Sequence, residues 1–163
     1  MKKFTSIIEA CSKAGGYVSG LFMLLIVALI SVEIVVRTLF DTSTLIADEY
    51  SAYFFVVVVM MGLSFSMKEG AHIRISLLRG KLSEKVQAVL DAVVLVGAIA
   101  LTCFALYHAV LMTYDVWELE MTADSISETP IYIPQLVIPV GLFLLIVQLI
   151  SDLLRRLLSF QIR

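Results

Sequence analysis

The sequence has little charge and few residues able to form disulfides or hold a metal. Of its 163 residues, 16% are charged and 60% are hydrophobic. A soluble domain of this length cannot bury so much apolar surface in one core, so the composition indicates a membrane protein. The two cysteines, Cys11 and Cys103, are too few for a disulfide framework, and we interpret both as reduced, packed thiols.

Histidine is also scarce, and motifs for catalysis are missing. His72 lies at the edge of an apolar run, whereas His108 lies about 24 Å of helix rise beyond Ala92. Both rings therefore cannot bind one iron or zinc, which argues against a redox anchor subunit that holds haem. We interpret His108 as a hydrogen-bonded helix residue. The sequence has no Walker loop, HExxH, Gly-x-Ser-x-Gly or CxxC motif, so we expect no enzyme and no cofactor or metal in this chain.

Four uncharged runs are long enough to cross a membrane. They are Ala14–Val32, Tyr50–Met67, Ala92–Tyr114 and Thr129–Ser151. A helix needs roughly 20 apolar residues to span a hydrocarbon core of ~30 Å. We therefore predict an all-α integral membrane protein with four transmembrane helices in a single domain, residues 1–163, with helices at about 14–38, 48–68, 88–115 and 130–155. The first run is too long for a signal peptide, so we interpret it as a retained anchor.

The basic residues predict how these helices are oriented. Apart from Arg37, lysine and arginine occur only in the two tails and in the connection between the second and third helices, whereas the other two connections are acidic. The positive-inside rule therefore places both termini in the cytoplasm. Aromatic residues gather at the predicted outer boundary, as is typical of membrane interfaces. They are Tyr50, Tyr53, Tyr114, Trp117 and Tyr132.

The predicted cytoplasmic connection carries an amphipathic pattern. Apolar side chains recur at every fourth residue from Leu78 to Leu90, and basic side chains fall between them. This pattern predicts a short amphipathic helix within an interfacial segment at about 70–85, at the level of the lipid headgroups or against a partner helix. Composition alone favours a simple tether to anionic lipid at the membrane surface.

Two features lie within the predicted helices themselves. Glu33 and Arg37 are one turn apart in the order that favours an ion pair. A membrane glutamate can exchange protons in a small exporter, but an adjacent arginine favours the permanently charged form, so we interpret these residues as a structural pair within this helix or shared with another subunit. Pro130 and Pro134 lie near the first turn of the fourth helix, where a missing amide is tolerated, whereas Pro139 lies deeper and should kink it.

Three stretches resemble the small, DctQ-type membrane subunit of TRAP transporters, the tripartite ATP-independent periplasmic uptake systems. Val32–Phe40 (VEIVVRTLF) is similar to the end of helix one in that family. Ala47–Leu78 is similar to its helix two, with an acidic start, a mid-helix glycine and the turn Glu-Gly-Ala-His-Ile. Thr129–Gly141 (TPIYIPQLVIPVG) is similar to its helix four. The chain departs from the family at Thr38 and Ser76, where tyrosine and aspartate are common.

The resemblance implies an accessory subunit rather than an enzyme, in the inner membrane of a bacterium or archaeon. In such systems a periplasmic protein captures an organic anion, and a large membrane subunit transports it with sodium, which is expected to bind there. The small subunit packs against the large one as a scaffold, surrounded by membrane lipids, and no nucleic acid is involved. Structural or interface roles are implied for the residues that match the family, to which we add Glu33 and Arg74. The matching residues are Arg37, Glu49, Gly62, Gly70, His72, Pro139 and Gly141.

Two further hypotheses follow from the charged residues. Carboxylates of the outer connections are candidates for docking the periplasmic protein, although lysine and arginine are in any case excluded from that side. These carboxylates are Asp48, Asp115, Glu118, Glu120 and Asp124. The main alternative function is a small homodimeric, proton-coupled multidrug-type exporter that uses Glu33.

Overall fold

The computed structural model describes residues 2–69 and 84–161. Its helices are α1 (Lys2–Phe40), α2 (Ala47–Lys68), α4 (Glu84–Glu118), the short α5 (Tyr132–Gln135) and α6 (Val137–Gln161). Four of them, α1, α2, α4 and α6, are long and apolar enough to cross a membrane, which confirms the predicted fold class. Residues 70–83 of the predicted interfacial segment, with Gly70, His72 and Arg74, lie outside the described residues, and residues 84 and 85 belong to α4.

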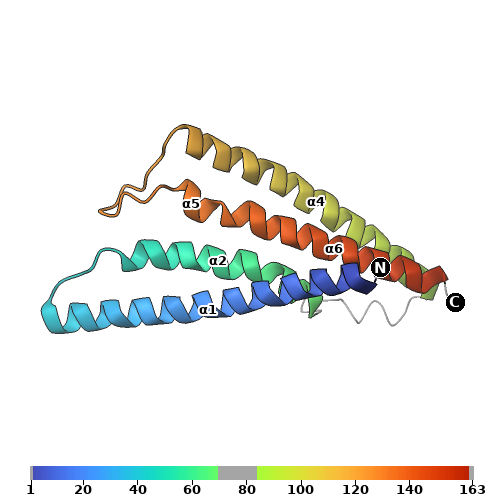
Figure 1. Cartoon of the computed structure of the whole chain (residues 1–163), viewed down its shortest axis with the longest axis horizontal. Coiled ribbons are helices and arrows are strands. Elements are labelled where there is room, and N and C mark those ends of the chain that lie inside the picture. The colour runs from blue at the N-terminus through green and yellow to red at the C-terminus, as the bar shows by residue number, and fades with distance from the viewer. Residues whose placement is uncertain (1, 70–83, 162–163) are drawn as a thin grey trace.

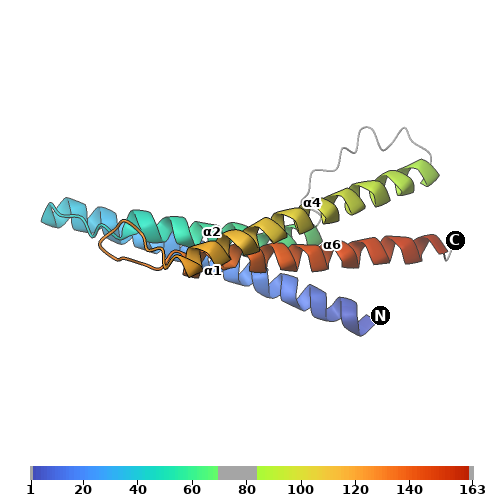
Figure 2. The same cartoon turned by 90° about the horizontal axis from the view of Figure 1, so that it is seen from above.

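The long helices lie side by side in the order α1, α2, α6 and α4 (Figure 1). The α2 helix packs against α1 and α6, and α6 also packs against α4. Among the described helices, α4 has no extensive contact with α1 or α2. The helices spread apart toward the connections in Figure 1 and toward the termini in the perpendicular view of Figure 2. The four helices therefore form an open row rather than a closed bundle.

Both termini lie at one end of this row, and the two short connections, 41–46 and 119–131, lie at the other (Figure 1). We call these ends the terminal end and the loop end. At the loop end, Asp48 and Glu49 occupy the first turn of α2, where carboxylates complement the helix dipole. At the terminal end, α1 begins at Lys2, well before the apolar run that starts at Ala14. Which end faces the cytoplasm stays a prediction from the basic residues.

The prolines interrupt the hydrogen-bond ladder of the last helix near its start. Leu136, between α5 and α6, keeps helical dihedral angles, with φ of −55° and ψ of −24°, and Pro139 lies in the first turn of α6. Because proline has no amide hydrogen, Pro139 cannot donate to the carbonyl of Gln135 four residues earlier, and the hydrogen-bond ladder is opened at that point. The interruption between α5 and α6 lies where Pro139 is expected to bend the helix, and the kink itself stays a prediction.

The α6 helix is the most enclosed part of the row. In its most apolar window 33% of the residues are buried, against 6% in the corresponding window of α1.

Both cysteines are free and exposed, so the prediction of packed thiols is wrong within this chain. They lie on outward surfaces of α1 and α4, which face the surroundings of the row.

Candidate functional site

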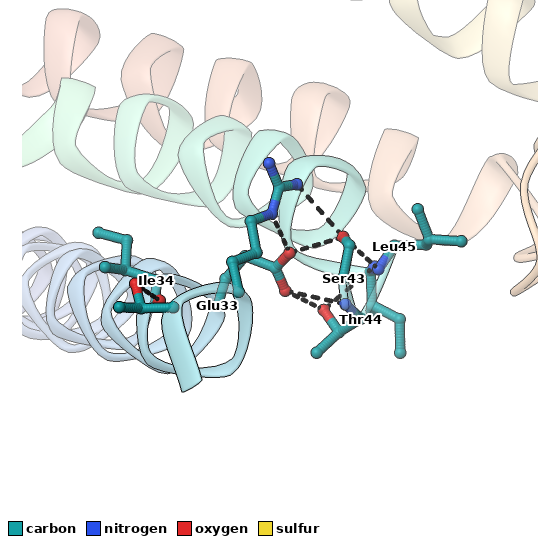
Figure 3. A network of polar contacts seen from close by, with 8 residues as sticks. Glu33, Ile34, Ser43, Thr44 and Leu45 are labelled. Atoms are coloured by element: carbon teal, nitrogen blue, oxygen red, sulfur yellow. Dashed lines mark hydrogen bonds and ion pairs between the residues drawn. The ribbon is translucent and has the colours of Figure 1, made fainter. Parts of the chain in front are cut away.

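Glu33 forms the centre of a hydrogen-bond network that joins α1 to the 41–46 connection (Figure 3). Its Oε1 accepts hydrogen bonds from Arg37 Nε and from Ser43 Oγ, both at 2.6 Å. Its Oε2 accepts one from the backbone N–H of Thr44 at 3.1 Å and another from Thr44 Oγ1. Glu33 is only 7% exposed, so the network supplies the partners that a buried carboxylate requires.

The connection held by Glu33 has an uncommon backbone. Asp41 and Leu45 both adopt left-handed conformations, with φ of 49° and 57°. Aspartate tolerates this region, but leucine rarely enters it, so the conformation needs support from its surroundings. Ser43 gives that support, because its hydroxyl donates to Glu33 and accepts from the N–H of Leu45 at 3.2 Å.

Glu49 accepts hydrogen bonds that hold the second connection at the loop end. Its Oε1 accepts a hydrogen bond from Tyr53 Oη at 2.8 Å, one turn along α2. Its Oε2 accepts one from Ser127 Oγ at 2.8 Å. Ser127 also lies 2.9 Å from Thr129 Oγ1, which in turn lies 3.2 Å from the hydroxyl of Tyr50. The first turns of α2 thus hold a segment that is distant in sequence.

That segment, 119–131, folds back on itself as a short hairpin. Thr122 and Pro130 form an antiparallel bridge, and the N–H of Ile131 donates to the carbonyl of Met121 at 3.1 Å. The carboxylates proposed for docking are all exposed around this hairpin, on the last turn of α4, on the hairpin itself and at the start of α2. They are Asp115, Glu118, Glu120, Asp124 and Asp48.

Glycines allow the helices of the row to approach closely. A Cβ atom added at Gly141 of α6 would lie 2.6 Å from the backbone oxygen of Met60 in α2. One at Gly62 would lie 3.1 Å from Ser19 Oγ in α1. Both glycines were predicted from the sequence, and the structure places them at the two faces of α2 that meet α6 and α1. Small residues at such interfaces are typical of membrane helix packing.

Further interface residues were missed by the sequence analysis. A Cβ at Gly15 would lie 2.7 Å from the backbone oxygen of Met61, and Ser19 follows one turn later on the same face. This small-xxx-small spacing was a signal that could have identified the contact between α1 and α2.

The family of the chain follows from comparison with known proteins. The model of the DctQ family, described as the DctQ component of tripartite ATP-independent periplasmic transporters, matches residues 26–159. The chain belongs to the DctQ family. A protein of Haemophilus influenzae, named as a proposed TRAP transporter small permease protein, is 23% identical over 143 residues, which cover 88% of this chain and 87% of that protein. These findings confirm the resemblance seen in the sequence.

Membership assigns the chain a general role and location. It is a small permease subunit of the TRAP type, and a multi-pass protein of the prokaryotic inner membrane. Within this DctQ chain the Glu33–Arg37 ion pair is present as predicted from the spacing, whereas the roles of the predicted residues in subunit contacts stay predictions.

A polar cluster toward the terminal end of this DctQ chain was also missed. Ser12 Oγ of α1 donates to Gln148 Oε1 of α6 at 2.8 Å, and Gln148 Nε2 donates to Asp152 Oδ1 at 3.2 Å. Ser12 and Gln148 are 2% and 1% exposed, so their hydrogen bond is sheltered from water. A glutamine and an aspartate one turn apart in an apolar helix were the available signal.

Neighbouring arginines of α6 extend these contacts to both sides of the helix. Arg155 pairs with Glu9 of α1, and Arg156 pairs with Asp91 of α4. The α6 helix therefore has polar contacts with each of the two outermost helices.

His108 does not belong to this polar cluster. It is exposed on α4, with its ring centroid 4.4 Å from that of Phe104, in place of the hydrogen-bonded setting that we expected.

Proposed function

We propose that this chain is the non-enzymatic scaffold subunit of a sodium-driven, binding-protein-dependent importer of organic anions. Beyond family membership, the observation that supports the proposal is the structural role of two carboxylates, Glu33 and Glu49. Each is surrounded by donors from its own chain and holds a connection in place. A proton-exchanging glutamate needs access to water and freedom to lose its partners, so this arrangement favours a scaffold over an exporter.

The open row supports a role in binding a larger membrane subunit. The α4 helix packs on α6 along one side and exposes bulky apolar side chains elsewhere, among them Val93, Leu101 and Phe104. We infer that the large permease subunit packs against the row. Arg37, Gly62, Pro139 and Gly141 then act indirectly, because they fix the helices and connections that present these surfaces.

The loop end is the proposed contact for the periplasmic binding protein. Its exposed carboxylates form an acidic surface around the hairpin, and such surfaces steer the association of partners with opposite charge. Neutralising Asp115, Glu118, Glu120 and Asp124 together is expected to weaken docking at low salt and to matter less at high salt.

The proposed function is tested by isolating the chain with its partners. We expect the full chain, tagged at its C-terminus and extracted from native membranes in mild detergent, to retain a larger polytopic protein in fixed ratio. Reconstituted with a binding protein, this complex should take up an organic anion only when a sodium gradient is imposed. Isolation of a homodimer that catalyses proton-driven efflux, abolished by Glu33→Gln, would establish the exporter instead.

A further inference from the structure

An apolar groove of about 370 Å³ lies at the loop end, between α4 and the break that separates α5 from α6. Its first wall is a stripe of α4, formed by Val110, Thr113, Tyr114 and Trp117. Its second wall is formed by Tyr132, Leu136 and Pro139. The volume lies within the range of small-ligand sites, roughly 300–1,000 Å³.

The lining determines what kind of group fits the groove. Thr113 donates its hydroxyl to the carbonyl of Ala109 in its own helix at 2.8 Å, so that donor is already used. Tyr114 and Trp117 have apolar ring faces and a single polar atom each, a combination that is enriched where hydrocarbon meets headgroups. The groove therefore suits a hydrocarbon chain at the membrane boundary.

The charges near the groove have one sign. Residues 86–154, which include both walls, contain no lysine or arginine. Glu118 follows Tyr114 by four residues, so it lies on the same face of α4, one turn closer to the loop end, and it is exposed. A lipid with net negative charge would be repelled here, whereas an ammonium group would be attracted.

We propose that the groove binds an acyl chain of phosphatidylethanolamine, with the lipid's ammonium group beside Glu118. The apolar walls account for the chain, and the acidic rim accounts for the headgroup. The site requires only residues of α4, α5 and α6, and binding there does not depend on transport by the complex.

The single tryptophan of the sequence makes this proposal measurable. Trp117 lines the groove, and its fluorescence is quenched by bromine on a neighbouring acyl chain. The full chain is reconstituted in bilayers with equal amounts of phosphatidylethanolamine and phosphatidylglycerol, and only one of the two lipids carries bromine. We expect brominated phosphatidylethanolamine to bind near Trp117 about fivefold more strongly, the ratio that one charge contact near a membrane surface supplies. Equal quenching by the two lipids overturns the proposal.

Two variants and a control separate the acyl chain from the headgroup. Val110→Phe fills the groove and should remove the preference, whereas Val96→Phe, on an exposed part of α4 away from the groove, should keep it. Glu118→Gln should remove the preference while quenching by both lipids persists. A preference that survives Glu118→Gln overturns the headgroup assignment. Weak quenching by both lipids would show that no acyl chain lies in the groove beside Trp117, and would overturn the proposal.

Discussion

At the scale of single residues, acidic side chains in membrane helices of this chain act as anchors for connections. Glu33 accepts from Ser43 and Thr44, and Glu49 accepts from Ser127, so each carboxylate joins a helix to a connection. Charged acceptors form the stronger class of hydrogen bonds, so these two carboxylates are expected to contribute strongly to holding the loop end.

Removing the Glu33 carboxylate should loosen the 41–46 connection. Glu33→Ala takes away the acceptor shared by Arg37, Ser43 and Thr44, so Ser43, which supports the left-handed backbone at Leu45, is held less firmly. We expect faster hydrogen exchange in residues 41–46 and a Tm of the purified protein that is lower by several degrees.

Ser31→Ala is the matched control for this change. In the unchanged protein, the hydroxyl of Ser31 donates only within α1, to the carbonyl of Val27 at 2.7 Å. Removing this hydroxyl should therefore leave the connection unchanged. If both variants shift the Tm equally, the loss reflects a general effect of altering α1 rather than the network.

Sequence reasoning found part of the residue-scale picture. The Glu33–Arg37 pair was predictable because helix geometry alone brings residues four apart together. The bonds to Ser43 and Thr44 were not, since they depend on left-handed backbone at Asp41 and Leu45 that the sequence does not signal. The bond between Ser12 and Gln148 joins helices that are far apart in the sequence, and it exists only because α1 also makes a smaller contact with α6 beside α2.

At the scale of elements, close packing at glycine decides how α6 sits on α2. An added methyl group at Gly141 would overlap the backbone of Met60, which cannot move unless a whole helix shifts. We expect Gly141→Ala to destabilise the folded protein by about 1–3 kcal/mol, the usual cost of overpacking, measured by reversible unfolding in detergent.

Gly97→Ala serves as the control for that prediction. Gly97 lies in the middle of α4 with no heavy atom within 4 Å of the added Cβ, so alanine meets open space there. The substitution should be neutral or stabilising by roughly 0.5–1 kcal/mol, because alanine loses less backbone entropy in a helix. Equal destabilisation by the two substitutions would contradict the packing argument.

The elements themselves were largely predictable, but their arrangement was not. Uncharged runs located the four long helices because the hydrocarbon core fixes how many apolar residues a span needs. Apart from the small residues Gly15 and Ser19, which indicate the contact between α1 and α2, the order of the helices in the row has no comparable signal. The valines of α4 are spread around the helix, so no apolar stripe indicates which neighbour it packs against.

At the scale of the whole molecule, the row has two chemically different ends. The terminal end carries Arg155 and Arg156, whereas the loop end carries the acidic hairpin. The positive-inside rule predicts that the terminal end faces the cytoplasm.

Labelling with a membrane-impermeant maleimide tests this orientation in intact cells. Single cysteines at Thr42 and Asp124, exposed positions in the two connections of the loop end, should react from outside when Cys11 and Cys103 are replaced by serine. Exposed Cys11, kept as the sole cysteine, should react only after the membrane is permeabilised. The opposite pattern would reverse the orientation, and opposite behaviour of Thr42→Cys and Asp124→Cys would contradict the fold.

The open row has a consequence for how the protein is made. The ribosome completes α1, α2 and α4 before α6, yet α6 is the helix that lies between α2 and α4. A nascent chain that ends before Tyr132 contains a paired α1–α2 hairpin and an α4 that has no extensive contact with α1 or α2, the other described helices made by then. The row is complete only when α6 has packed against both α2 and α4, so the subunit acquires its shape after α6 has been made.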